Sequence, residues 1–199
     1  MANRPEKETR KSDRVRLSKA EKIAIPIILI IAIWVVYSAT QPSIPSQTTT
    51  STGTSHAGGP DFTLPNVVNG QPVTLSSFRG KIVFLEFMEP WCSHCQSMAP
   101  SLESLYKQFG NKVVFISVAG PWNGPDGKPA SAADAVNFMN QYGSTWTYVY
   151  DSSGTVMNNE FGVTATPTIF IIGKDGSILT SYTGEQSYDT LAAYLNSVS

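Results

Sequence analysis

The chain has 199 residues, of which 41% are hydrophobic, enough for one compact domain and an additional segment. It contains only two cysteines and two histidines, whereas a structural zinc site requires four such ligands. Because His56 lies in a low-complexity stretch and His94 lies between the cysteines, no metal site is expected.

Positive charge is concentrated at the N-terminus. Residues 1–22 hold eight of the 14 Lys and Arg residues and four of the 15 acidic residues, a net charge of +4. The remaining six basic and eleven acidic residues give the rest of the chain a net charge of −5. A basic tail on an acidic domain is compatible with nucleic-acid binding, but the segment that follows favours a membrane-topology signal. No nucleic acid is therefore expected as a partner.

An apolar segment follows the basic tail. Residues 23–60 contain no charged side chain, and residues 23–39 alone would span about 26 Å as a helix, close to the thickness of a bilayer core. We predict a single transmembrane signal-anchor helix over residues 23–40, with residues 1–22 as a cytoplasmic tail and the C-terminal domain outside the cytoplasm. A cleaved signal peptide is the alternative, but its n-region would be unusually long and bulky Tyr37 would lie near the cleavage site.

A linker separates the predicted anchor from the folded domain. Residues 41–59 are rich in Ser, Thr, Pro and Gly and show no apolar period, which is typical of a flexible tether. The folded domain is therefore expected over residues 60–199, and it contains no internal repeat.

The domain alternates predicted strands with predicted helices. The Asn69-Gly70 pair between short strands at 62–64 and 73–75 predicts an N-terminal β-hairpin. The nearly continuous apolar run over residues 81–88 is typical of a central strand buried on both faces. Further strands are predicted at 113–118, 146–150, 168–172 and 177–182, and helices from the cysteine motif to 109 (with Gly110 as C-cap) and at 132–142, 156–161 and 188–198. This order predicts an α/β domain with a central mixed sheet flanked by helices.

Both cysteines lie in one Cys-x-x-Cys motif. Cys92 and Cys95 follow directly after the predicted central strand and open a predicted helix, where open α/β sheets place functional sites. As a structural staple, a disulfide over so short a loop would contribute only about 2 kcal/mol, against about 4.7 kcal/mol for a hundred-residue loop. The spacing therefore favours thiol-disulfide chemistry, for which no cofactor is expected.

Two segments resemble the signatures of the thioredoxin superfamily. They are KIVFLEFMEPWCSHC and FGVTATPTIF, the second of which contains Thr166-Pro167. The opening PDFTLPNVVNGQPVTLSSFRGK and a predicted helical insert between Val118 and Tyr148 are similar, more narrowly, to the membrane-anchored TlpA-like and ResA-like thioredoxins. The resemblance covers about residues 60–199 and implies a thioredoxin-like fold preceded by a single transmembrane helix. It also implies that Pro167 is a cis proline beside the disulfide, and that Thr166 presents backbone hydrogen bonds to a bound substrate chain.

The residues of the motif are expected to play different roles. Cys92 at a helix N-terminus gains from the helix dipole and from free backbone amides, so it is the predicted nucleophile, and Cys95 is the predicted resolving thiol. His94, if protonated or donating a hydrogen bond, would stabilise the Cys92 thiolate further; the alternative is a solvent-facing residue with little effect. Trp91 is expected to shield the disulfide and to offer a substrate-facing surface, with simple packing as the alternative.

A carboxyl group interrupts the apolar run of the predicted central strand. Glu86 lies six residues before Cys92, where thioredoxins carry a buried Asp and TlpA-like proteins usually lack an acid. A carboxyl group in such a strand should have a raised pKa and is a candidate general base toward Cys95. The alternative is a carboxyl group that reaches water, and Glu89 in the following loop is a competing acid.

These features predict a membrane-tethered extracytoplasmic thiol-disulfide oxidoreductase that acts on Cys-containing proteins through Cys92 and Cys95. The direction stays open, because His94 and the compartment favour oxidation or isomerisation, whereas the TlpA-like and ResA-like resemblance favours reduction. A reductase outside the cytoplasm would need a membrane or soluble redox partner, since the predicted anchor contains no cysteine.

Three other functions on the same fold are weaker alternatives. A peroxiredoxin-like peroxidase needs Thr or Ser three residues before its reactive Cys, where this chain has Glu89. A copper-binding module of the Sco type needs Cys-x-x-x-Cys and a distal His, and no His follows His94. A redox-inert chaperone is the third, and the two intact thiols argue against it.

Overall fold

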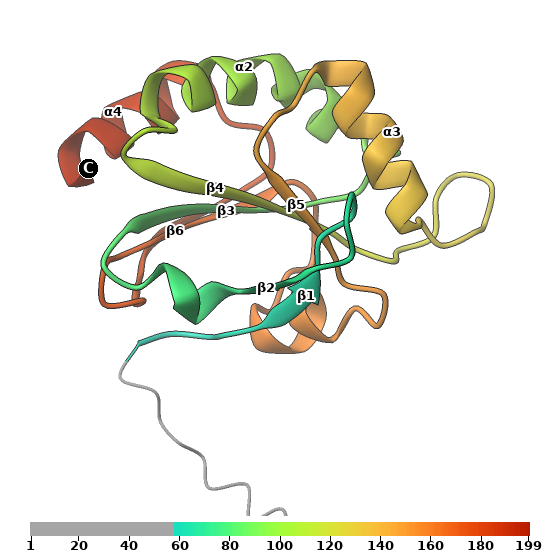
Figure 1. Cartoon of the computed structure of the whole chain (residues 1–199). Helices are drawn as coiled ribbons and strands as arrows, with labels where there is room; N and C mark the ends of the chain where they lie inside the picture. Colours follow the sequence, from blue (N-terminus) through green and yellow to red (C-terminus); the bar gives the residue numbers. More distant parts are fainter. Residues whose placement is uncertain (1–57) are drawn as a thin grey trace, which may run out of the picture. The chain divides into compact units, whose positions relative to one another are not determined.

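The computed structural model describes residues 58–199, which contain one five-stranded sheet and a separate two-stranded sheet (Figure 1). The predicted cytoplasmic tail, the predicted anchor helix and all but the last two residues of the predicted linker lie outside the described residues, and they stay predictions. None of the helices within residues 58–199 combines the length and the apolar character that crossing a bilayer requires.

The larger sheet is mixed, as predicted. Its strands are β3 (Ile82–Met88), β4 (Val113–Ala119), β5 (Thr147–Tyr150), β6 (Thr168–Ile172) and β7 (Ile178–Thr183). In the strand order β5-β4-β3-β6-β7, the central β3 runs parallel to β4 and antiparallel to β6. β5 is parallel to β4, and β7 is antiparallel to β6. Each strand begins and ends within one residue of its predicted range, so the α/β class is confirmed.

Successive side chains of β3 point to opposite faces of the sheet. Phe84 and Met88 belong to the core that also contains both cysteines, whereas Leu85 and Phe87 belong to a second core on the other face. Every residue of β3 is buried, which explains the continuous apolar run. Glu86 shares the face of Phe84 and Met88, so its carboxyl group lies on the same side of the sheet as the cysteines.

Three α-helices cover that face, α2 (Ser93–Phe109), α3 (Ala132–Tyr142) and α4 (Tyr188–Val198) (Figure 1). The bounds of α3 and α4 are those that the apolar periodicity predicts. α3 begins with a capping box, in which Ser131 Oγ accepts from the Asp134 N–H and the Asp134 carboxylate accepts from the Ser131 N–H. Together with the loop before it, α3 forms the predicted helical insert between β4 and β5.

Gly110 ends α2 as predicted, although its backbone is not left-handed as is common for a glycine at this position. Its φ is −62°, and its N–H donates to the Tyr106 carbonyl oxygen at 2.8 Å. A Cβ atom at residue 110 would lie 2.7 Å from the Tyr106 ring and carbonyl oxygen, closer than real contacts allow. Glycine is therefore favoured by the close approach of Tyr106 rather than by a positive φ.

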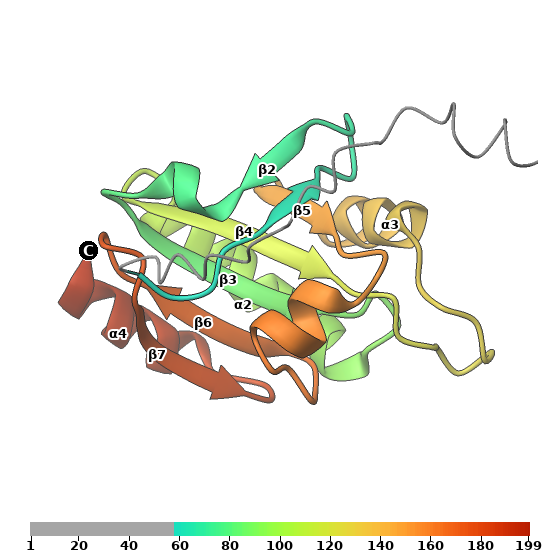
Figure 2. The ribbon, with the colours of Figure 1, turned by 90° about the horizontal axis from the view of Figure 1, so that it is seen from below.

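A hairpin and two short helical turns cover the opposite face of the sheet (Figure 2). β1 (Thr63–Pro65) and β2 (Pro72–Thr74) pair antiparallel, which confirms the predicted hairpin. The connection comprises residues 66–71, and Gly70 supplies a φ of +69° there. The two turns are a 3-10 turn, η1 (Leu75–Phe78), and a π-helical turn, η2 (Val156–Glu160), at the predicted short helix.

Candidate active site

The redox motif lies where β3 ends and α2 begins. Cys92 is the N-cap residue of α2, and its N–H donates to the Glu89 carbonyl oxygen at 3.0 Å. Cys92 Sγ accepts a hydrogen bond from the Cys95 N–H at 3.4 Å, as a capping side chain does. Cys92 is 6% exposed, Cys95 is fully buried, and both are free thiols. Cys92 is thus the outer sulfur of the pair, at the positive end of the helix dipole.

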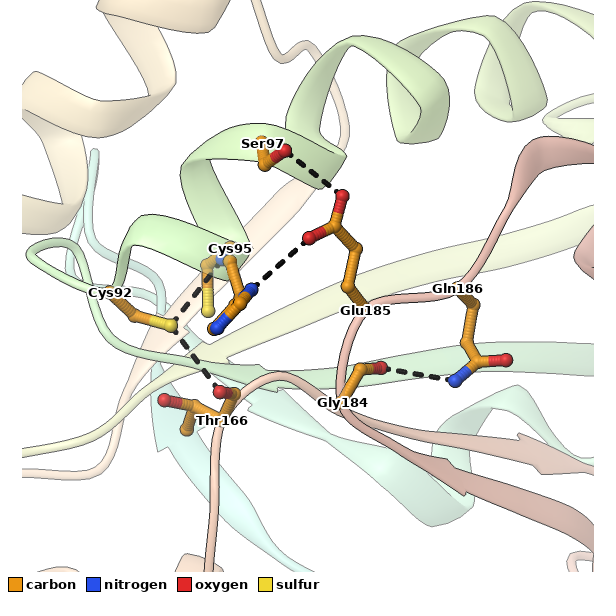
Figure 3. Close-up of polar contacts among 8 residues, drawn as sticks. Cys92, Cys95, Ser97, Thr166, Gly184, Glu185 and Gln186 are labelled. Carbon is orange, nitrogen blue, oxygen red and sulfur yellow. Dashed lines mark hydrogen bonds and ion pairs between the residues drawn. The ribbon is translucent and has the colours of Figure 1, made fainter.

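A segment 74 residues further along the chain meets the Cys92 sulfur. The Cys92 thiol donates to the Thr166 carbonyl oxygen at 3.3 Å, and Figure 3 shows the Thr166 main chain across the site from the sulfur. The Thr166-Pro167 peptide bond is cis, as the family resemblance implies. The roles of Thr166 and Pro167 in substrate binding stay predictions.

Cys95 lies on the buried face of α2, in the core between the helix and the sheet. Burial raises the pKa of its thiol above the ordinary value, and the negative charge of Glu86 raises it further. A thiol in this position stays protonated and is a poor nucleophile until a base removes its proton. A resolving role for Cys95 therefore requires a nearby proton acceptor.

Glu86 is only 2% exposed, so the alternative in which its carboxyl group reaches water is wrong. Its Oε2 accepts from Ser117 Oγ at 2.6 Å, and Ser117 Oγ accepts from Trp146 Nε1 at 2.9 Å. Burial raises the pKa of Glu86 to about 7, although the Ser117 hydrogen bond opposes the shift. Near neutral pH the carboxyl group therefore exists in both protonated and ionised forms, as a proton-transfer group must. Its role toward Cys95 stays a prediction.

Glu89 is a second buried carboxyl group. Its Oε1 accepts from the Trp122 N–H at 3.0 Å, while its Oε2 has no hydrogen-bond partner among residues 58–199. Burial raises the pKa of Glu89 to about 7, with the Trp122 hydrogen bond opposing the shift. A Cβ atom at residue 120 would lie 2.5 Å from Glu89 Oε1, so Gly120 leaves room for the carboxyl group. Through its hydrogen bond with Trp122, Glu89 links the loop before Cys92 to the loop of the insert.

Trp91 forms one wall of a groove beside the motif. It is 37% exposed, and its Nε1 donates to the Trp122 carbonyl oxygen at 3.2 Å. The groove has a volume of about 570 Å³ and lies between the active-site loop, the insert loop and α3. Its apolar lining consists of Pro90, Trp91, Pro125, Pro129, Ala130 and Phe138. Trp91 is therefore accessible to a partner, and its contact with substrate stays a prediction.

His94 is exposed and faces an acidic residue that sequence reasoning missed. Its Nδ1 lies 3.1 Å from Glu185 Oε2, and Ser97 Oγ donates to Glu185 Oε1 at 2.9 Å (Figure 3). Within the described part of the chain, the His94 ring makes no other hydrogen bond and none to Cys92. No sequence signal pairs His94 with Glu185, because they lie 91 residues apart. The effect of His94 on the Cys92 thiolate stays a prediction.

This mixed sheet, with a Cys-x-x-Cys pair at the N-terminus of α2 opposite a cis proline, defines a thioredoxin-like thiol-disulfide oxidoreductase. The chain belongs to the AhpC/TSA family, whose sequence pattern matches residues 57–181. It is 31% identical over 139 residues to the thiol-disulfide oxidoreductase ResA of Bacillus thuringiensis subsp. konkukian. That alignment covers 70% of this chain and 75% of the ResA chain.

Solved bacterial structures agree with this assignment. One is a secreted Mycobacterium tuberculosis disulfide oxidoreductase homologous to E. coli DsbE, with 26% identity and a TM-score of 0.59, covering 69% of this chain and 96% of that chain. Another is the pneumococcal exposed lipoprotein thioredoxin Etrx1 of Streptococcus pneumoniae strain TIGR4, with 29% identity and a TM-score of 0.58, covering 69% and 99%. The thioredoxin-like fold and the enzyme class predicted from the sequence are confirmed.

Proposed function

We propose that this protein is a membrane-tethered, extracytoplasmic enzyme that exchanges disulfides with Cys-containing proteins, with Cys92 as nucleophile and Cys95 as resolving thiol. The observation that carries the proposal is the position of Cys92 Sγ, which caps α2 and faces Thr166 across the site. The location rests on the basic residues 1–22 and the apolar residues 23–40. The substrate class is supported by relatives that are named thiol-disulfide oxidoreductases.

The exchange takes place in two steps. In the reductive direction, the Cys92 thiolate attacks one sulfur of a substrate disulfide, and the other substrate sulfur leaves as a thiolate that takes up a proton. Cys95 then loses its proton and attacks the Cys92 sulfur of the mixed disulfide, which releases the second substrate thiol. The substrate gains two electrons and two protons, while Cys92 and Cys95 become a disulfide. Oxidation is the reverse sequence, and the membrane or soluble redox partner that resets the pair determines the direction.

The Thr166 carbonyl oxygen is a candidate anchor for the substrate main chain. In the free enzyme this oxygen accepts the Cys92 thiol hydrogen bond. In a mixed disulfide Cys92 carries no proton, so the oxygen is free to accept a backbone N–H of the substrate chain. Pro167 follows directly in the chain, and Trp91, the residue before Cys92, offers an exposed aromatic surface. The substrate segment next to the reacting cysteine would therefore contact Thr166, Pro167 and Trp91.

Replacing Glu86 with glutamine is expected to slow the second step about 10- to 100-fold at pH 7.5, because the resolving thiol loses its proton acceptor. In the wild type the rate of this step should rise with pH through about 7, as Glu86 loses its own proton and becomes able to accept one from Cys95. The variant should lack that rise. Rapid quenching of a preformed mixed disulfide at Cys92, followed by mass spectrometry at several pH values, measures the rate.

Glu89→Gln is the matched control for this experiment. Glu89 is also buried and its pKa is also raised to about 7, but its carboxyl group binds Trp122 in the insert loop. The rate of the second step in Glu89→Gln should therefore still rise with pH. Equal rates and equal pH profiles for wild type and Glu86→Gln would rule out Glu86 as the base.

Right-side-out membrane vesicles from cells that express the full chain test the activity and the location together. Insulin cannot cross the membrane, so intact vesicles should accelerate its reduction by dithiothreitol, and vesicles carrying Cys92→Ser should not. Activity that appears only after lysis would contradict the extracytoplasmic location. Activity that matches Cys92→Ser both before and after lysis would contradict thiol-disulfide exchange.

The same vesicles separate the alternative functions. A peroxiredoxin-like enzyme would consume hydrogen peroxide at the expense of a dithiol, and a copper-binding module would take up copper at the two thiols. Among the side chains of residues 58–199, no group of three or more His, Cys, Asp or Glu is placed to hold a metal ion. We expect disulfide exchange to exceed both of the other activities.

A further inference from the structure

Glu185 joins the start of α2 to the segment that carries the cis proline. It lies between β7 and α4, and one of its carboxylate oxygens contacts His94 while the other accepts from Ser97 (Figure 3). Its neighbour Gly184 donates its N–H to the Pro167 carbonyl oxygen at 2.8 Å and has a φ of +85°, which glycine adopts without strain. The backbone next to Glu185 is therefore hydrogen-bonded to the cis-proline segment, while its side chain contacts the start of α2.

The carboxylate determines which nitrogen of His94 carries a proton. An ionised carboxylate only accepts hydrogen bonds, so Nδ1, at 3.1 Å from Glu185 Oε2, must be the donor. In the neutral ring this leaves Nε2 as the basic nitrogen. The hydrogen bonds from His94 and Ser97 hold the pKa of Glu185 below its ordinary value, so the carboxylate stays ionised at neutral pH. When the imidazole is protonated, it forms an ion pair with the Glu185 carboxylate.

A protonated His94 would place a positive charge near the nucleophile Cys92. His94 is the second residue of α2, and Cys92 is the N-cap of the same helix. Positive charge there adds to the helix dipole and to the Cys95 amide in favouring a thiolate at Cys92. Among residues 58–199, Glu185 is the one acidic group in contact with the His94 ring.

We propose that Glu185 is a positioning residue of the redox site, whose carboxylate holds the His94 imidazole through Nδ1, pairs with its positive charge and thereby supports the Cys92 thiolate. This inference rests on the proposed role of Cys92 as nucleophile. Glu185 touches neither sulfur and acts only through His94. Because the His94–Glu185 pair is exposed to solvent, its effect on reactivity is modest, about two- to threefold.

The test measures the rate at which iodoacetamide alkylates Cys92 in the full chain, as a function of pH. Glu185→Gln is expected to lower this rate about two- to threefold near pH 7, because glutamine keeps a hydrogen-bond acceptor but loses the charge. Glu160→Gln is the matched control, since Glu160 is exposed and belongs to η2, which packs against the opposite face of the sheet. The control should alkylate at the wild-type rate.

The same substitution in a His94→Ala chain distinguishes an effect of Glu185 through His94 from a general structural effect. In a His94→Ala chain no imidazole remains, so Glu185→Gln only removes a negative charge, and Cys92 should react at an equal or higher rate. When His94 is absent, Glu185→Gln should therefore leave the alkylation rate of Cys92 unchanged or raise it. An equal fall in rate in both backgrounds, or no fall in either, would overturn the proposal.

The His94 tautomer provides a readout that does not depend on thiol reactivity. In a His56→Gln chain His94 is the only histidine, so the nitrogen resonances of one ring report which nitrogen carries the proton. Wild type and Glu185→Gln should show Nδ1–H in the neutral ring, and Glu185→Ala should lose it. Identical tautomers in all three chains would contradict the positioning role. Normal insulin reduction by the wild type, with no effect of Glu185, would refute this inference alone and leave the proposed function standing.

Discussion

Replacing Cys92 with serine is expected to reduce insulin reduction by the full chain to the uncatalysed background. Cys92 is the sulfur at the N-terminus of α2, where the helix dipole and the Cys95 amide favour a thiolate. Cys95 cannot take its place, because it is fully buried and burial raises the pKa of its thiol above the ordinary value. Cys95→Ser should also lose turnover, but its Cys92 can still attack the substrate disulfide. Because no resolving thiol remains, the mixed disulfide should accumulate.

The matched control for both cysteine variants is Ser93→Ala. Ser93 is an exposed small residue between the two cysteines and should leave turnover at the wild-type level. Turnover by Cys92→Ser above background, or accumulation of a mixed disulfide in Cys92→Ser rather than in Cys95→Ser, would reverse the roles assigned to the two thiols.

Stability is expected to fall as the pH rises toward neutrality, because two carboxyl groups are buried in the folded domain. Burial raises the pKa of Glu86 from 4.5 to about 7, so the folded protein binds this proton more tightly than the unfolded chain does. The resulting stabilisation is fully present below pH 4.5 and is lost as the pH rises from 4.5 to about 7. For Glu86 it amounts to about 3 kcal/mol of unfolding free energy, and Glu89 acts in the same direction.

Urea unfolding of the full chain at pH 4 and pH 8 measures this effect. Glutamine at residue 86 keeps an acceptor for the Ser117 hydroxyl but has no proton to lose, so the pH-dependent part should disappear. The difference in unfolding free energy between Glu86→Gln and wild type should change by about 3 kcal/mol between the two pH values. Glu160→Gln, at an exposed carboxyl group, should show no such change. A constant difference for Glu86→Gln would mean that Glu86 titrates as it does in water.

The fold was predictable from the sequence because its elements carry local signals. Burial of β3 on both faces leaves a continuous apolar run over residues 82–88, in which a single carboxyl group is visible as an exception. The capping box at Ser131 and the apolar period of α3 likewise lie within a few residues of each other. Gly110 shows the limit of such signals, since glycine is favoured there by the close approach of Tyr106 rather than by a positive φ.

Contacts between distant parts of the chain had no local signal. Sequence reasoning located Cys92, Cys95 and Glu86 because they lie on one strand, loop and helix that follow each other. It placed Glu89 only as an acid in a loop, because its partner Trp122 lies 33 residues further along the chain. It missed Glu185 entirely, since pairing with His94 depends on how the loop before α4 packs against α2. The resemblance to thioredoxins supplied the cis Thr166-Pro167 bond, which no residue pattern predicts.

Trapping the mixed-disulfide intermediate distinguishes the attacking thiol, Cys92, from the resolving thiol, Cys95. The full chain carrying Cys95→Ser is incubated with a disulfide-bonded peptide, and the product is digested and mapped by mass spectrometry. We predict one mixed disulfide per chain, located on Cys92, and no adduct in the Cys92→Ser chain treated in the same way. An adduct that forms on Cys95 of the Cys92→Ser chain at a comparable rate, or no adduct in either chain, would show that Cys92 is not the attacking thiol.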